Sequence, residues 1–169
     1  MTTGRTARRS RLLQGTALTL SLLLWCLRAS ALTSCSASAT GVAFGTYNPL
    51  SASAAVTTGS LTVNCTLLSG AATAVSLRVD LGSGLSGSYA ARTLRSGLNA
   101  INYNLYWSTA YTQVWGDGTG GSFYGTASVT LTPGNPTAAV SGTMYARAPA
   151  AQDVAAGIYA DTIVVTVTY

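Results

Sequence analysis

The chain has no histidine, lysine or glutamate among its 169 residues, and only 8% of its residues are charged. General acid–base catalysis draws mainly on histidine and carboxylates, and histidine is the commonest metal ligand. Four isolated carboxylates remain, Asp80, Asp117, Asp153 and Asp161. We therefore expect no catalytic residues, no metal site and no small-molecule cofactor, and the length fits one domain.

The nine basic residues are all arginines, and they are unevenly placed. A basic stretch over residues 5–11 precedes an apolar run over residues 12–27, and Ala29-Ser30-Ala31 follows it. This order is typical of a secretory signal peptide with an A-x-A cleavage site. We predict a signal peptide over residues 1–31 and one mature domain over residues 32–169.

Removal of this segment changes the charge balance of the protein. The whole chain has a formal net charge of +5. After cleavage four arginines oppose the four aspartates, so the net charge becomes 4 − 4 = 0; these arginines are Arg78, Arg92, Arg95 and Arg147. The basic character belongs to the removed segment, and we expect no nucleic-acid partner.

Three other interpretations of the N-terminus stay open. Leu32-Thr33-Ser34-Cys35 fits a lipoprotein processing site, but Arg28 separates it from the apolar run. Arg8-Arg9 gives only a weak twin-arginine signal. Retention as a membrane anchor is disfavoured because an apolar run of about 16 residues is short for a spanning helix.

Two cysteines, Cys35 and Cys65, remain after the predicted cleavage. In an oxidising compartment an isolated pair indicates one disulfide. The alternative is a reactive or metal-binding thiol, but neither cysteine has a neighbouring His, Lys or Cys to lower its pKa. Lipidation of Cys35 would also leave Cys65 unpaired.

The mature chain alternates apolar and polar residues in short segments separated by Gly, Ser, Asn and Pro. This pattern predicts about seven strands and no amphipathic helix, which is the profile of an all-β, immunoglobulin-like sandwich. The predicted strands are residues 42–47, 61–65, 75–81, 103–107, 127–131, 140–145 and 159–169. We interpret the glycine-rich residues 115–121 as a turn, since they lack the lysine of a phosphate loop and supply one carboxylate for a cation.

Five stretches occur in an order that is specific when they are taken together. They are residues 35–49, with Cys35 and Phe44-Gly45; 59–66, with Cys65; Tyr103-Asn104-Leu105-Tyr106; 115–121; and 157–169. Together they resemble the spore coat protein U domain family over essentially the whole mature chain. That family includes subunits of archaic chaperone-usher pili of Gram-negative bacteria.

The resemblance implies a pilin-type immunoglobulin fold that lacks its last strand. A periplasmic pilus chaperone and then another pilus subunit would fill the gap by β-strand addition, with assembly at an outer-membrane usher and export through the periplasm to the cell surface. It also implies a Cys35–Cys65 pair joining the first two strands. We expect the acceptor groove to be lined by Phe44, Ile163, Val165, Val167 and Tyr169; the alternative is that this face is ordinary closed core.

One departure from the family pattern concerns the donor segment. Cleavage after Ala31 leaves only Leu32, Thr33 and Ser34 before Cys35. A donor strand with its linker needs roughly ten to twenty residues. The chain is therefore expected to accept a strand without donating one, which predicts a terminal or tip position in a fibre, or a coat or surface role.

Three functions from different classes compete. The leading hypothesis is a structural subunit of a pilus or spore-coat type. The second is a self-contained secreted adhesive or binding module that does not polymerise, and its surface contacts would be Tyr106, Tyr111 and Trp115, with Trp107. An enzyme comes third because no nucleophile has a base beside it and no carboxylates are paired.

Overall fold

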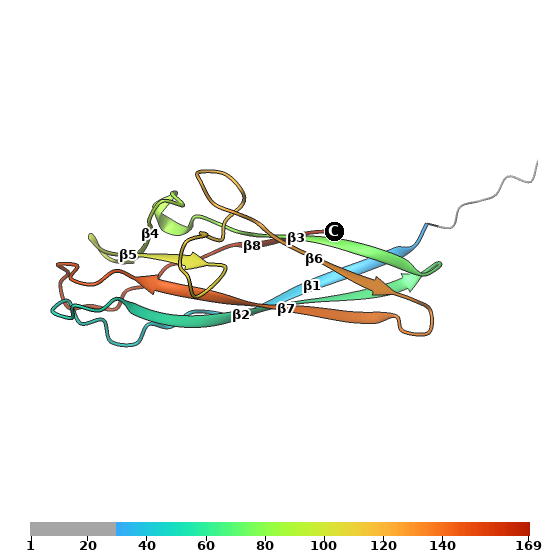
Figure 1. Ribbon diagram of the computed structural model, residues 1–169, viewed down its shortest axis with the longest axis horizontal. Coiled ribbons are helices and arrows are strands. Elements are labelled where there is room, and N and C mark those ends of the chain that lie inside the picture. The colour runs from blue at the N-terminus through green and yellow to red at the C-terminus, as the bar shows by residue number, and fades with distance from the viewer. Residues whose placement is uncertain (1–29) are drawn as a thin grey trace, which may run out of the picture.

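A computed structural model describes residues 30–169 as two antiparallel sheets (Figure 1). The larger sheet has the order β1 (Leu32–Thr40), β2 (Ala55–Ser69), β7 (Thr137–Ala148), β5 (Asn99–Tyr106) and β4 (Arg92–Ser96). The smaller sheet has the order β6 (Gly125–Leu131), β3 (Thr73–Leu81) and β8 (Val165–Thr168). One 3₁₀ turn, η1 (Gly84–Ser86), interrupts the strands. The predicted all-β sandwich is confirmed.

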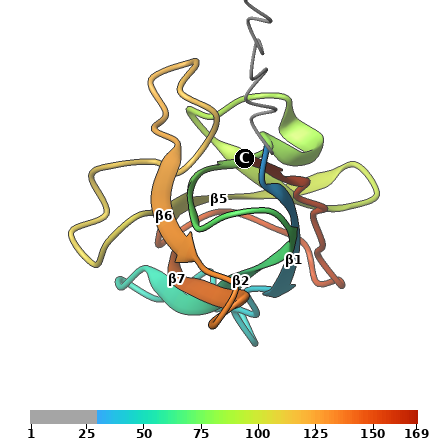
Figure 2. The same ribbon diagram turned by 90° about the vertical axis from the view of Figure 1, so that its right-hand side faces the viewer.

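The core lies between the two sheets and follows the period-two pattern of the sequence. Leu61 and Val63 of β2 and Leu77 and Val79 of β3 are all buried and belong to one core cluster. The residues between them on each strand point outward. Figure 2, which looks along the long axis, shows the two layers enclosing this interior. Burial of alternate apolar side chains therefore explains most of the strands.

The prediction for the first strand is wrong in position. Residues 42–47 form no strand, and β1 lies earlier, where it pairs antiparallel with β2 from Leu32 to Thr40. Most of β1 consists of Ser, Thr and Ala, so it lacks the apolar contrast that marks a half-buried strand. Its ladder to β2 and its cysteine hold it in place instead.

The C-terminal strand is shorter than the predicted residues 159–169. Only Val165–Thr168 form a ladder, with Leu81 opposite Val165 and Val79 opposite Val167. Upstream, Ala160 makes an isolated bridge to Arg95 of β4. Residues 160–165 therefore cross from the larger sheet to the smaller one, so residues 159–169 do not form one continuous strand. β4 itself was not predicted.

Within residues 30–169 no helix has the length and apolar character needed to cross a membrane. The predicted signal peptide lies outside the described residues except for Ser30 and Ala31.

Candidate functional site

Two strand edges face one another on one side of the sandwich. Among residues 30–169, β1 forms a ladder only with β2, and β8 forms a ladder only with β3. Blue β1 and the dark red C-terminal segment nevertheless run side by side (Figure 2). We call this side the open seam: the facing edges of β1 and β8, together with residues 42–49 and 154–163.

The apolar layer beneath the open seam is incompletely covered. Ile163, Val165 and Val167 pack against the core, yet each stays partly exposed. Their neighbours Thr162, Val164 and Thr166 point to solvent. By contrast, β2 and β3 bury most of their inward side chains almost completely. The inner face of β8 is therefore apolar but lacks a full set of neighbours.

The open seam widens into a cavity of about 720 Å³ between residues 42–49 and 154–159. Phe44 lines it and packs edge to face on Tyr103, with the ring centroids 5.9 Å apart. Leu94 and Ile101 form part of its apolar lining, and no lining residue carries a charged side chain. This end of the seam has room for additional apolar side chains.

Four of the five residues expected in the groove lie on the open seam. Phe44 lines the cavity, while Ile163, Val165 and Val167 continue along the C-terminal segment. Tyr169 lies apart: its side chain is 55% exposed and borders a shallow depression beside Ser76, Arg78 and Thr168.

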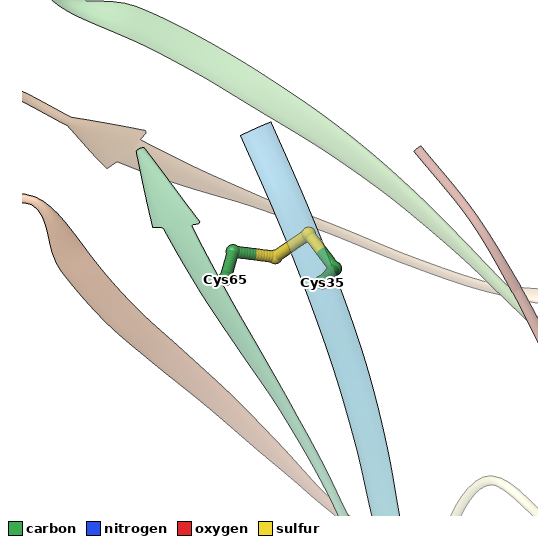
Figure 3. The surroundings of a disulfide bond; sticks show 2 residues. All are labelled: Cys35 and Cys65. Atoms are coloured by element: carbon green, nitrogen blue, oxygen red, sulfur yellow. A yellow bond between two sulfur atoms is a disulfide. The ribbon is translucent and has the colours of Figure 1, made fainter. Parts of the chain in front are cut away.

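A disulfide fixes the β1 side of the open seam. Cys35 of β1 and Cys65 of β2 are directly opposite in the ladder, with an S–S distance of 2.04 Å (Figure 3). Cys65 is buried in the core, whereas Cys35 is only partly buried. The predicted bridge is confirmed, and it attaches an edge strand of mostly small residues to the neighbouring strand β2.

Asp161 fixes the approach to β8. Its Oδ2 accepts a hydrogen bond from the Tyr103 hydroxyl at 2.7 Å, and its Oδ1 accepts from the backbone N–H of Leu85 and of Thr162, each at 2.8 Å. Burial, reinforced by the bond to Asp161, raises the pKa of the Tyr103 hydroxyl. One carboxylate therefore ties the C-terminal segment to β5 and η1.

Tyr47 and Gln152 hold the wide end of the open seam. The Tyr47 hydroxyl donates to Pro149 O at 2.6 Å and accepts from Gln152 N at 3.0 Å. The Gln152 side-chain amide exchanges two hydrogen bonds with the Asn102 backbone, at 2.7 and 2.9 Å. The Gln152 side chain therefore makes the pair of hydrogen bonds that the backbone of an adjacent strand would make with Asn102. It does so beyond the end of β7 at Ala148. Sequence reasoning missed this role of Gln152, and no local signal marks it.

The aromatic residues expected to contact a surface differ in exposure. Trp115 contradicts the expectation: it is 2% exposed, and its Nε1 donates to Val79 O at 3.1 Å. The glycine-rich loop folds the indole inward, where it fills space between the sheets. Tyr106 and Tyr111 pack edge to face with centroids 5.4 Å apart and are partly exposed. Trp107, at 43% exposure, is the more accessible indole.

The chain also matches a known protein family. The Spore Coat Protein U domain matches residues 21–166. The chain belongs to that family. Among curated relatives of this spore coat protein U domain chain, Protein U of Myxococcus xanthus is 39% identical over 141 residues, covering 75% of this chain and 70% of the relative.

A solved structure supports the fold of this family member. The match is to a chaperone–tip adhesion subunit pre-assembly complex, CsuC-CsuE, from archaic chaperone-usher Csu pili of Acinetobacter baumannii. The TM-score is 0.52 at 21% identity, covering 82% of this chain and 40% of the other. The described chain thus spans less than half of that structure, and at this identity the likeness concerns the fold.

Proposed function

We propose that this spore coat protein U domain chain is a structural subunit of a secreted surface assembly, and that its open seam accepts a β-strand from a partner chain. The observation that carries the proposal is the pair of facing, unladdered edges above a half-buried apolar layer. An added strand would pair its backbone with these edges and place alternate side chains on the layer.

The chemistry of the open seam favours an uncharged, apolar strand. Its wide end offers about 720 Å³ lined by Phe44, Leu94 and Ile101, without a charged side chain. Unpaired edges of this kind are an aggregation hazard, so a protein that keeps them benefits from a partner that covers them. Both points support strand addition over a permanently open sheet.

The family and the similarity of the fold to a subunit in a chaperone–subunit complex support the choice of partners. We propose a periplasmic pilus chaperone as the first strand supplier and a neighbouring subunit as the second, with passage through an outer-membrane usher. Export through the periplasm is part of the same proposal. The terminal or tip position depends on cleavage after Ala31, so it stands as a prediction from the sequence.

Strand capture tests the proposal. The secreted, disulfide-bonded protein is titrated with a soluble synthetic peptide in which Val and Thr alternate, while peptide anisotropy and thermal unfolding are measured. We expect saturable binding and a rise in Tm, because the peptide binds the native state. A stable protein that captures no strand peptide and no chaperone would contradict the proposal and favour a self-contained module.

Neighbouring valines provide matched variants for this titration. Val165→Asp places a charge on the inward face of β8 and should abolish peptide binding. Val164→Asp makes the same change on the outward face, where the side chain is 67% exposed, and should retain binding. Val165→Ala provides a milder inward change if the charged variant fails to fold. Equal binding by all three would contradict the assignment.

A further inference from the structure

Tyrosines gather at one end of the outer face of the larger sheet. Tyr106 of β5 is directly opposite Tyr145 of β7, and Arg147 follows two residues later on the same face. Tyr111, from the loop after β5, packs edge to face on Tyr106 with the ring centroids 5.4 Å apart. The three tyrosines are partly exposed, and Arg147 is exposed. We call Tyr106, Tyr111, Tyr145 and Arg147 the tyrosine platform.

The backbone of Tyr111 is strained. Its φ is +52°, in the left-handed region that bulky side chains rarely adopt. The loop is nevertheless closed tightly: Tyr111 N–H donates to Ser108 O at 3.2 Å, and Trp107 N–H donates to Gln113 O at 3.1 Å. The strained loop places the Tyr111 ring beside Arg147, whose Cζ lies 5.6 Å from the ring centroid. Strain of this kind is typical of functional positions.

The platform lacks the carboxylate that a similar pair on the smaller sheet has. Arg78 Cζ lies 4.1 Å from the centroid of the Tyr124 ring, so the arginine–tyrosine arrangement occurs twice. Arg78 also pairs with Asp80 at 2.9 Å, and within residues 30–169 this is the one ion pair. Arg147 therefore has an aromatic neighbour but no anionic one. A ligand with a carboxylate would supply the missing partner.

The same outer face continues toward the start of β7, where β1, β2 and β7 lie side by side. Its residues pair across the ladders as Ser34, Thr66 and Thr137; Ser36, Asn64 and Ala139; Ser38, Thr62 and Ser141; and Thr40, Ser60 and Thr143. We call these residues the hydroxyl face, since all but Asn64 and Ala139 are Ser or Thr. They are exposed or partly exposed, and none carries a charge.

The two parts of this outer face match the chemistry of a polysaccharide that carries carboxylates. A pyranose ring presents C–H groups that stack on aromatic rings, and its hydroxyls exchange hydrogen bonds with Ser and Thr. A uronate carboxylate forms a paired contact with a guanidinium group. β7 has 12 residues, so the face is roughly 40 Å long. That length accommodates several sugar units of one extended chain.

We propose that the outer face of the larger sheet binds an acidic polysaccharide. A uronate carboxylate pairs with Arg147, its ring stacks on Tyr111, and the following sugar units lie along the hydroxyl face. Figure 1 shows β2 and β7, which carry much of this face, running along the length of the molecule. The site uses the face of the sheet and not the edges of the open seam, so it does not depend on strand addition.

Titration calorimetry of the secreted, disulfide-bonded protein with three polymers tests the proposal. Polygalacturonate is an unbranched uronate chain, and its methyl ester keeps the same rings without the charge. We expect saturable binding of polygalacturonate at physiological ionic strength, and at least about tenfold weaker binding of the ester, because Arg147 then has no carboxylate to pair with. Polyglutamate carries the same charge without sugar rings and should not bind.

Two variants separate the contribution of the charge from that of the ring. Arg147→Met should leave Tm unchanged and remove the preference for polygalacturonate over its ester. Tyr111→Asn removes the ring, while asparagine tolerates the left-handed φ. It should keep a Tm close to that of the wild type and bind both polymers at least about tenfold more weakly.

Matched controls lie outside the tyrosine platform. Arg95→Met removes an exposed arginine of β4, and Tyr124→Asn removes a tyrosine that is 47% exposed beside Arg78. Both controls should bind polygalacturonate like the wild type. All four variants should also capture the Val/Thr strand peptide, so the outcome at this face and the outcome at the open seam are measured separately.

Three outcomes would overturn the proposal. The first is that the wild type binds no polygalacturonate, or binds it no better than the methyl ester. The second is equal binding of polyglutamate, which would show attraction between charges without recognition of a sugar. The third is that Arg147→Met and Tyr111→Asn bind polygalacturonate like the wild type, which would place the polymer elsewhere on the molecule.

Discussion

Arg92 is completely buried, and its partners within residues 30–169 are neutral acceptors. Its guanidinium donates to the carbonyls of Gly82 at 2.8 Å and Trp115 at 2.7 Å, and to Asn104 Oδ1 at 2.7 Å. Burial lowers the pKa of this guanidinium. The Arg92 side chain therefore provides hydrogen-bond donors to buried backbone carbonyls in two loops, one at Gly82 and one at Trp115.

Replacing Arg92 should destabilise the fold strongly. Arg92→Met leaves buried carbonyls without donors, and we expect a loss of about 3 to 5 kcal/mol in the free energy of unfolding. The matched control is Arg95→Met on the same strand, where the side chain is exposed and the change should stay within about 0.5 kcal/mol. Denaturant unfolding of both variants measures the difference, and equal losses would contradict this role.

Tyr103 should make stability fall at alkaline pH. Burial and the bond to Asp161 raise its pKa above the ordinary 10.0, so the folded state keeps a proton that the unfolded state loses above about pH 10. Stability is then unaffected below that pH and falls above it, by up to about 1.4 kcal/mol per pH unit for one group.

Urea unfolding between pH 9 and 11 measures this dependence. Tyr103→Phe should flatten it, although Tyr89, whose pKa burial also raises, should leave a residual slope. The same slope in the wild type and in Tyr103→Phe would show that Tyr103 is not the group responsible.

At the scale of the element, β1 is an edge strand with little apolar burial of its own. Its outward residues are Ser and Thr except for Leu32, and its attachment consists of the ladder to β2 and the disulfide. To accept a strand on its unpaired edge, β1 must keep its register with β2 on the other edge. The Cys35–Cys65 bridge meets this need because it joins directly opposite residues of β1 and β2.

Loss of the disulfide should therefore affect both stability and strand capture. The double variant Cys35→Ser, Cys65→Ser opens a loop with a sequence separation of 30 residues, which should cost about 3 to 4 kcal/mol. We also expect weaker binding of the strand peptide, measured by the same anisotropy titration at a temperature where the variant is folded. Unchanged peptide affinity would contradict a role for the bridge in holding the acceptor edge.

Sequence analysis located the strands that bury one face in the core and expose the other to solvent. The predicted strands over residues 75–81 and 127–131 lie within β3 and β6, because each buries alternate apolar residues. β1 escaped prediction because small polar residues fill it. β4 escaped because its one fully buried residue is Arg92, at the start of the strand, and arginine is a residue type that normally indicates exposure.

The candidate site was predictable only in part for a related reason. The alternation over residues 163–167 indicated an inward face, and Phe44, which was predicted to flank it, lines the cavity at the wide end of the seam. The bonds made by Asp161, Tyr47 and Gln152 join residues far apart in the chain, so no local pattern marks them. Trp115 was misplaced because a glycine-rich loop usually lies on the surface, whereas here it turns the indole inward.

On the scale of the whole molecule, the mature start of the chain decides which roles it can fill. We predict that the secreted protein begins at Leu32 and that its mass is two hydrogens below the fully reduced value. N-terminal sequencing and intact mass spectrometry measure both. A start near Leu32 supports an acceptor without a donor segment, whereas a lipidated Cys35 would contradict both the cleavage site and the Cys35–Cys65 bridge.

The most direct test of the central claim is amide hydrogen exchange of the secreted protein with and without a bound strand, either the Val/Thr peptide or a chaperone. Strand addition at the open seam predicts that amides of β1, and of residues 163–168, exchange at least about tenfold more slowly when the strand is bound. Amides in the β2–β7 ladder, which is already paired, should change little. Protection confined to other surfaces, or no change at β1 and β8, would contradict the claim.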